Sequence, residues 1–88
     1  MATEIKDLPL NDNKEAQQFE LDIDGAIAFI AYEAHNGDIA LVHTEVPEAL
    51  EGKGIGSVLA LKTLEYIEAQ GRKIIPLCPF VKSYIKRH

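Results

Sequence analysis

The stretch that decides the fold is Glu51-Gly52-Lys53-Gly54-Ile55-Gly56-Ser57, because the residue pattern changes across it from that of strands to that of a helix. Its three glycines permit positive φ angles, so several backbone N–H groups can turn toward one point. The helix that follows adds unpaired N–H groups and the positive end of its dipole. The stretch predicts a strand-to-helix junction that suits a phosphate or pyrophosphate; the alternative is a flexible connection whose glycines only permit a turn.

Residues 52–57 of this stretch, called the glycine loop below, differ from two familiar phosphate-binding patterns. No Gly-Lys-Ser/Thr closes the loop at P-loop spacing, and it lacks a G-x-G-x-x-G run followed by an acidic residue for a ribose. Lys53 adds a cation. The candidates for cofactor binding here are Gly52, Lys53, Gly54, Ile55, Gly56 and Ser57.

The chain before the glycine loop has the period of strands. Apolar and polar residues alternate over residues 18–23, and the Asp24-Gly25 that follows favours a tight hairpin turn. Two further β-rich runs, separated by a turn cluster, occupy residues 26–46. We predict three antiparallel strands in a meander within a single domain at residues 15–88, preceded at residues 1–14 by a flexible arm or an edge strand.

The chain after the glycine loop has the period of a helix as far as Gly71, which suits the left-handed residue that closes a helix. The apolar face of this helix comprises Ile55, Leu59, Ala60, Leu64 and Ile67. Residues 73–78 then predict a short strand interrupted by Pro76, and residues 79–88 predict a short helix that begins with proline. The order βββ-α-β-α predicts a mixed α+β fold with a mostly antiparallel sheet and two helices.

The net charge of −5 is divided unevenly along the 88 residues. Residues 1–50 carry 11 acidic and 2 basic side chains, whereas residues 51–88 carry 3 acidic and 7 basic ones. A ligand responds to charges within roughly 8–10 Å of it. Residues 51–88 can therefore accept anions that the net charge of the whole chain would repel. The acidic total, and the lack of a basic stripe interleaved with aromatic residues, argue against nucleic acid as a partner.

Cysteine and histidine usage indicate the compartment and the chemistry. The single cysteine, Cys78, can form neither a disulfide framework nor a cysteine-based zinc site. His35 and His88 lack partners at ligand spacing, so we predict no metal site.

No apolar run approaches the ~18 residues of a membrane helix, and the start lacks a basic-then-apolar signal pattern. We expect a cytoplasmic protein that does not bind membranes.

Residues 46–57, followed by an amphipathic helix, resemble motif A of the Gcn5-related N-acetyltransferases, in which Q/R-x-x-G-x-G/A binds the pyrophosphate of acetyl-coenzyme A. Three further segments resemble the small single-domain subfamily of these enzymes: residues 43–46, 76–80 and 84–88. The motif opens here with Glu51 in place of Gln or Arg. The pyrophosphate contacts that the resemblance implies therefore come from the backbone of the glycine loop.

The resemblance implies an acetyl-coenzyme A-dependent N-acyltransferase with a minimal form of the family fold. It implies that the strand at residues 43–46 splays from the strand at residues 74–78, with Pro76 holding them apart by removing a ladder donor. The thioester would then lie near Val46 and Cys78. The cofactor contacts implied beyond the glycine loop come from Val46, Cys78, Pro79, Phe80, Lys82 and Arg87. For the basic side chains of the last helix, the alternative is an ordinary solvated face.

Three side chains are candidates for acyl transfer, which needs a positioned thioester and a deprotonated amine. Cys78 lies just before a predicted helix, where a thiol becomes more reactive; it can accept the acyl group, form a disulfide with the cofactor, or be an ordinary buried cysteine. Glu45 and His43 alternate onto one face of their strand, so either can take the proton of the amine. The alternatives are a solvated carboxylate and a core histidine.

The implied acceptor is a primary amine, on a small molecule or on a lysine or N-terminus of a protein, and the acidic half of the chain favours a cationic one. The alternative function is a non-catalytic coenzyme A-binding or protein-interaction module of the same fold, because so short a chain leaves little wall for a substrate pocket. We expect a monomer or a weak homodimer. Val58 and Leu61, which fall among charged helix positions, are the residues that a partner would cover.

Overall fold

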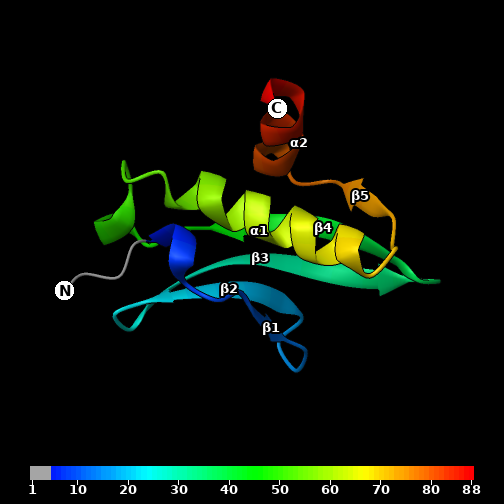
Figure 1. Ribbon diagram of the computed structural model, residues 1–88, viewed down its shortest axis with the longest axis horizontal. Coiled ribbons are helices and arrows are strands. Elements are labelled where there is room, and N and C mark those ends of the chain that lie inside the picture. Colours follow the sequence, from blue (N-terminus) through cyan, green and yellow to red (C-terminus); the bar gives the residue numbers. More distant parts are fainter. Residues whose placement is uncertain (1–4) are drawn as a thin grey trace.

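The computed structural model describes residues 5–88, which form a five-stranded sheet with one long helix packed on one face and a short helix after the last strand (Figure 1). The strands are β1 Asn11–Asn13, β2 Gln18–Ile23, β3 Ala26–His35, β4 Asp38–Glu45 and β5 Ile74–Pro76. The helices are α1 Ile55–Ala69 and α2 Pro79–Arg87, with short 3₁₀ turns at Ile5–Asp7 and Glu48–Leu50. Strands β1 to β4 form an antiparallel meander, and β5 pairs with β4 in parallel. The predicted α+β fold is confirmed.

Strand β1 belongs to the segment predicted as an arm or an edge strand, so the sheet begins inside that segment; residues 1–4 lie outside the described residues. Side-chain amides attach β1 to β2 through the buried carboxylate of Glu20. This carboxylate accepts hydrogen bonds from Asn11 Nδ2 at 3.1 Å, Asn13 Nδ2 at 3.0 Å and Gln18 Nε2 at 2.6 Å. Gln18 lies in β2 beside Glu20, so the two asparagine donors of β1 are the ones that hold this short strand of polar residues at the sheet edge.

The same amide donors make Glu20 a source of pH-dependent stability. The hydrogen bond from Gln18 lowers the pKa of Glu20, burial opposes this, and Asn13 and Asn11 lower it further. Because the pKa in the folded state lies below that of the unfolded state, the stabilisation is present above the unfolded pKa and is lost as the pH falls through the folded one.

We expect Glu20→Gln to lower the free energy of unfolding by about 1–2 kcal/mol at pH 7, because the ionised acceptor of three amide donors is removed. Urea denaturation at pH 7 and at pH 3 measures the effect. The difference from the wild-type chain should be smaller at pH 3 than at pH 7, because the stabilisation from the lowered pKa of Glu20 declines as the pH falls below the ordinary pKa of a glutamate. Glu33→Gln, at an exposed position of β3, is the control. An equal loss at both pH values would contradict the assignment.

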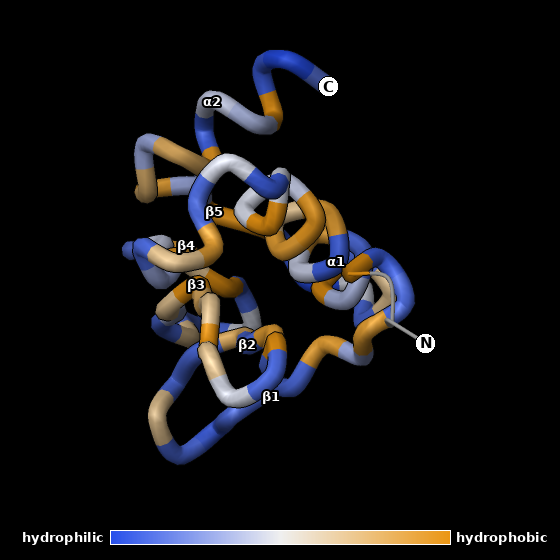
Figure 2. Tube along the Cα trace, turned by 90° about the vertical axis from the view of Figure 1, so that its left-hand side faces the viewer, coloured by the Kyte–Doolittle hydropathy of each residue, from blue (hydrophilic) through white to orange (hydrophobic). Residues whose placement is uncertain are grey.

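The core lies between α1 and the face of the sheet toward which it packs (Figure 2). The buried side chains of α1 are Ile55, Leu59, Ala60, Thr63 and Ile67. The helix period predicts Leu64 among them, but Leu64 lies at the margin of this stripe and is half-buried, while Thr63 is completely buried. Val58 packs partly against the core, and Leu61 is 46% exposed.

The pairing of β4 with β5 ends well before β4 does. The register joins Leu41 to Pro76, and the N–H groups of Leu77 and Cys78 then both donate to the carbonyl of Leu41, at 3.0 and 2.8 Å. Within residues 5–88, no strand therefore pairs with residues 42–45 of β4 on that side. The predicted splay is present, and the two strands separate at Leu41.

The role predicted for Pro76 in this splay is wrong. Two backbone hydrogen bonds to β4 flank β5: the N–H of Ile39 donates to the carbonyl of Lys73, and the N–H of Leu77 donates to the carbonyl of Leu41. Because alternate residues of a strand face the same neighbour, Lys73 and Leu77 both face β4. Pro76 lies at the intervening position, so its nitrogen faces the free edge of the sheet and removes no donor from β4. The strands separate because Cys78 turns back to the carbonyl that Leu77 already uses, which leads the chain into α2.

Candidate functional site

The glycine loop forms a cavity at the N-terminus of α1. Gly52 and Gly54 have φ angles of 81° and 73°, and an added Cβ at either would meet no atom within 4 Å. The first turn of the helix is closed by the N–H of Val58 on the carbonyl of Gly54, so the N–H groups of residues 55–57 have no partner inside the helix. The cavity, of about 220 Å³, is lined by Val46, Leu50, Glu51, Gly52, Gly54, Ile55, Gly56, Ser57 and Phe80.

This cavity brings together most of the residues predicted to bind the cofactor. Val46, the glycines of the loop and Phe80 line it, while Lys53 is exposed at its side and does not line it. The lining is open backbone with unpaired N–H groups, and α1 has no acidic residue in its first turn. The N–H groups and the helix N-terminus of this cradle fit a pyrophosphate, whereas the carboxylate of Glu51, which also lines the cavity, repels an anion.

Gly56 has a packing role in addition to its place in the loop. A Cβ built on Gly56 would lie 2.8 Å from Cζ of Phe80, which is too close for two carbon atoms. The absence of a side chain at residue 56 therefore lets the first turn of α2 approach the first turn of α1. The sequence pattern shows the glycine but not this reason for it, because Phe80 is far from it along the chain.

Cys78 lies where β4 and β5 separate. It is 4% exposed, immediately precedes α2, and its Sγ lies 3.2 Å from Oγ1 of Thr44. Burial raises the pKa of the thiol, but the Thr44 hydroxyl and backbone groups of Val81, Phe80 and Thr44 outweigh it, and the net pKa is lowered. Cys78 therefore has features of both predicted alternatives: the side chain is buried like an ordinary core cysteine, and its thiolate is stabilised as in a reactive one.

Thr44 is a site residue that the sequence analysis misses. It pairs with Ile30, a core residue, so its side chain lies on the α1 side of the sheet. No pattern in the sequence could have found it, because a bulge in β4 decides which face of the sheet Thr44 lies on.

His43 and Glu45 share one face of the sheet, as predicted, but it is the face opposite to Cys78. A bulge in β4 pairs His43 with Ala31 and Glu45 with Phe29, and both side chains are exposed. The alternative of a core histidine is therefore wrong; the ring of His43 lies beside that of Phe29, with centroids 6.2 Å apart.

Glu45 lines a second pocket, of about 530 Å³, on this outer face. Its lining comprises Ile27, Phe29, Glu45, Val46, Pro47, Glu48 and Glu51. Val46 and Glu51 line both this acidic pocket and the glycine-loop cavity. The two pockets therefore adjoin at the end of β4.

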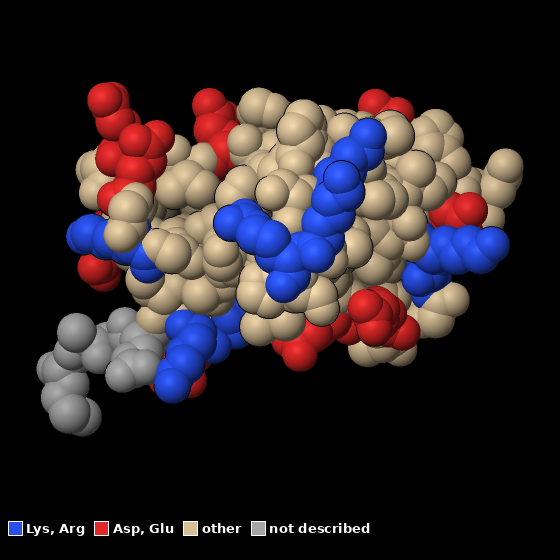
Figure 3. Space-filling view, turned by 90° about the horizontal axis from the view of Figure 1, so that it is seen from above, with Lys and Arg blue, Asp and Glu red and all other residues tan. Residues whose placement is uncertain are grey.

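The basic side chains of α2 gather on one face of the molecule (Figure 3), and neither Lys82 nor Arg87 lines the glycine-loop cavity. Lys82 and Pro79 line a separate pocket beside β5, together with Pro76, Ser83, Ile85 and Lys86. Arg87 donates from Nε to the carbonyl of Ser83 at 3.4 Å. The structure thus separates Lys82 and Pro79 from the glycine-loop cavity, because helical spacing turns them away from Phe80.

Two features are absent from residues 5–88. No group of three or more His, Cys, Asp or Glu side chains in this part of the chain is placed to hold a metal ion. Neither helix in it has the length and apolar character needed to cross a membrane.

Comparison with known proteins agrees with this geometry. A family model described as GCN5-related N-acetyl-transferase matches residues 18–88. Protein NATD1 of Mus musculus is 30% identical over 79 residues, which cover 86% of this chain and 72% of that protein. Protein NATD1 of Gallus gallus is 29% identical over 84 residues, covering 92% and 76%. The chain belongs to the GCN5-related N-acetyltransferase family.

Proposed function

We propose that the protein is an acetyl-coenzyme A-dependent N-acyltransferase that transfers an acyl group to a primary amine. The observation that carries the proposal is the continuity of the glycine-loop cavity with the unpaired edge of β4. The N–H groups of residues 55–57 would hold the pyrophosphate, and the backbone of residues 42–46 would hold the pantetheine arm beside Cys78. When bound, the cofactor supplies the acyl group as a thioester.

In this proposal the acidic pocket receives the acceptor. Its three carboxylates, Glu45, Glu48 and Glu51, stand over an apolar floor, and its lining contains no Lys or Arg. This combination favours an amine that arrives as a cation, whether on a small molecule or on a lysine or N-terminus of a protein. Glu45, or His43 beside it on the same face, would take the proton that the amine must lose before it attacks.

One observation favours the alternative of a binding module without turnover. His43 and Glu45 lie on the opposite face of the sheet from Cys78, so the amine must reach the acyl carbon past the end of β4 at Val46. If that path is closed, the chain binds the cofactor and transfers nothing.

Calorimetry with acetyl-coenzyme A tests cofactor binding. Release of free thiol in the presence of a panel of amines, polyamines and lysine peptides tests acyl transfer. Binding with accelerated thiol release supports the acyltransferase. Binding without release for any acceptor supports the module. A folded chain that binds no cofactor at millimolar concentration rejects both.

We expect Glu45→Gln to lower kcat/KM for the best amine by about 100-fold, the usual contribution of a general base. Cofactor affinity should change little, because Glu45 does not line the glycine-loop cavity. Initial rates of thiol release measure the effect, and Glu33→Gln, on the same sheet face but outside the acidic pocket, is the matched control. Equal rates for the Glu45→Gln variant and the control would exclude Glu45 as the base.

A further inference from the structure

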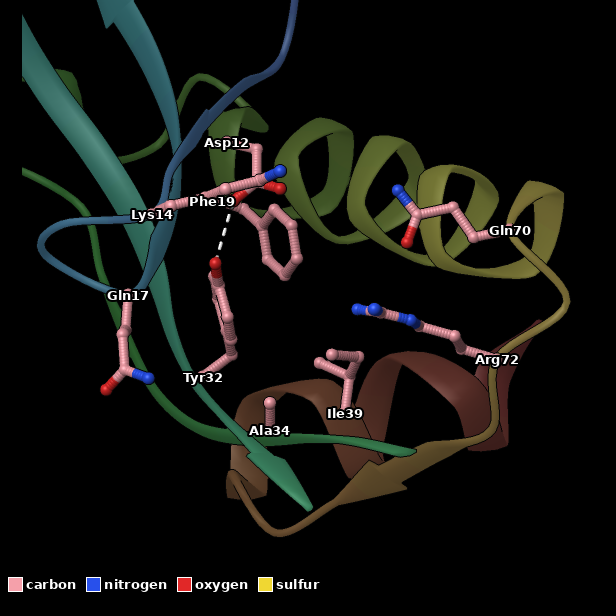
Figure 4. A pocket seen from close by; sticks show the side chains of 9 residues that line it. All are labelled: Asp12, Lys14, Gln17, Phe19, Tyr32, Ala34, Ile39, Gln70 and Arg72. Atoms are coloured by element: carbon pink, nitrogen blue, oxygen red, sulfur yellow. Dashed lines mark hydrogen bonds between the residues drawn. The ribbon is translucent and has the colours of Figure 1, made fainter. Parts of the chain in front are cut away.

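A fourth pocket lies at the opposite end of α1 from the glycine loop, where α1 ends above strands β1 to β3 (Figure 4). The 15 residues of α1 separate the two sites by about 22 Å along the helix axis. The pocket has a volume of about 570 Å³. Called the α1-end pocket below, it is lined by Asp12, Lys14, Gln17, Phe19, Tyr32, Ala34, Ile39, Gln70 and Arg72.

The floor of the α1-end pocket is rigid. The rings of Phe19 and Tyr32 stack with centroids 4.4 Å apart, and Ile39 beside them is 1% exposed. These side chains belong to the core that α1 covers, so the floor keeps its shape whether or not a ligand is present.

The wall of the pocket at the end of α1 is fixed by the way the helix ends. Gly71 has a φ of 71° and donates to the carbonyl of Glu68, and the N–H of Arg72 donates to the carbonyl of Ile67, at 2.9 and 3.3 Å. This arrangement is a Schellman motif, as the predicted closing role of Gly71 requires. It directs the side chains of Gln70 and Arg72 into the pocket (Figure 4).

The one acidic side chain of the lining is already engaged. Oδ1 of Asp12 accepts from the hydroxyl of Tyr32 at 2.8 Å, and Oδ2 accepts from the hydroxyl of Tyr66 at 3.2 Å. Burial and then Asp12 raise the pKa of Tyr32 to about 12, so this hydroxyl keeps its proton and goes on donating at physiological pH. Asp12 is therefore a poor acceptor for a bound cation.

The two cations of the lining remain available. Within residues 5–88, neither Lys14 nor Arg72 forms an ion pair. Lys14 comes from the β1–β2 turn and Arg72 from beyond α1, so their charges converge from two sides, with the amide of Gln70 between α1 and the floor (Figure 4). The two free charged groups of the lining are donors, and with one carboxylate against two cations its formal charge is positive.

We propose that the α1-end pocket binds a small metabolite through an oxyanion group, a phosphate or a carboxylate, held by Arg72 and Lys14 and by the amide of Gln70. The guanidinium can bind two oxygens of such a group at once, which an ammonium cannot. The volume is that of a small-molecule site. The proposal does not depend on the proposed function, because no residue of this pocket lines the glycine-loop cavity or the acidic pocket.

Backbone amide NMR titration of the full chain, in a buffer free of phosphate and carboxylate, tests this site. The probes are inorganic phosphate and citrate, with sodium chloride at matched ionic strength as the baseline. We expect saturable shifts at residues 14–17 and 70–72, and the probe with the lower Kd identifies the preferred oxyanion. Shifts that reach only the glycine loop, or that chloride reproduces, would overturn the proposal.

Arg72→Ala should raise the Kd of the better probe by about tenfold, the usual loss of a charged hydrogen-bonding partner, and Arg72→Lys should raise it less. The control is Lys73→Ala, which removes the next cation along the chain without changing the lining. Arg72 and Lys73 are both exposed, so the variants keep the fold, and dispersed spectra verify it. Equal affinities for Arg72→Ala and Lys73→Ala would show attraction by general charge instead of a site.

Discussion

Replacing Gly56 by valine is expected to lower the affinity for coenzyme A by at least about 100-fold. The first carbon of any side chain at residue 56 would lie 2.8 Å from the ring of Phe80, and valine adds two further methyl groups. Either the ring moves into the glycine-loop cavity or α2 moves away from α1, and both changes destroy the cradle. Overpacking of this kind also lowers the free energy of unfolding, by about 1–3 kcal/mol.

Calorimetry at a temperature where circular dichroism shows the variant to be folded separates lost binding from lost structure. Gly37→Ala is the control for loss of a glycine far from the cofactor cavity, since Gly37 lies in the β3–β4 turn, with a φ of 90° and open space around the position of its Cβ. It should cost about 1 kcal/mol of stability and leave cofactor binding unchanged. Phe80→Ala in the Gly56→Val background should restore part of the stability, because it removes the clash. Full binding by Gly56→Val would show that the cofactor does not use this cavity.

The second large effect concerns the thiol of Cys78. We expect the disulfide of coenzyme A to form a mixed disulfide with Cys78 about 100-fold faster than cystamine does at equal concentration. The thiolate attacks one sulfur, the S–S bond breaks, and coenzyme A leaves as its thiolate. Binding at the glycine loop would hold the disulfide beside a buried thiol that an unbound reagent seldom reaches.

Mass spectrometry measures both rates, and Thr44→Val tests the cause of the reactivity. Without the hydroxyl 3.2 Å from Sγ, the thiolate loses its side-chain donor, and we expect the reaction at neutral pH to slow by about tenfold for both reagents. Ser83→Ala, which removes an exposed hydroxyl of α2 that neither lines the glycine-loop cavity nor contacts the thiol, is the control. Equal rates with the coenzyme disulfide and with cystamine would place Cys78 outside the cofactor site.

The elements were predictable from the sequence because turn residues and glycines mark their ends. Asp24-Gly25 closes the β2–β3 hairpin, Gly71 closes α1, and the change of period at the glycine loop separates sheet from helix. The edge strand β1 could not be separated from an arm in the same way. Its place depends on the amide side chains of Asn11 and Asn13, which meet Glu20 of β2 only after the sheet has formed.

The orientation of side chains at the candidate site was less predictable, because one bulge determines it. Leu41 pairs with Tyr32 and faces the core, but His43 pairs with Ala31, so Val42 is an extra residue in β4. Strict alternation would place His43 on the buried face with Leu41. The bulge turns His43 and Glu45 outward and Thr44 toward Cys78, and no periodicity in the sequence announces it.

The proline in β5 has a consequence for how these molecules meet one another. A free sheet edge is a template on which another chain can add a strand, and such additions seed aggregates. At this edge the group that should donate to an incoming strand is the nitrogen of Pro76, which has no hydrogen to give. A concentrated solution of the protein therefore lacks, at this edge, the continuous row of donors from which a fibril would grow.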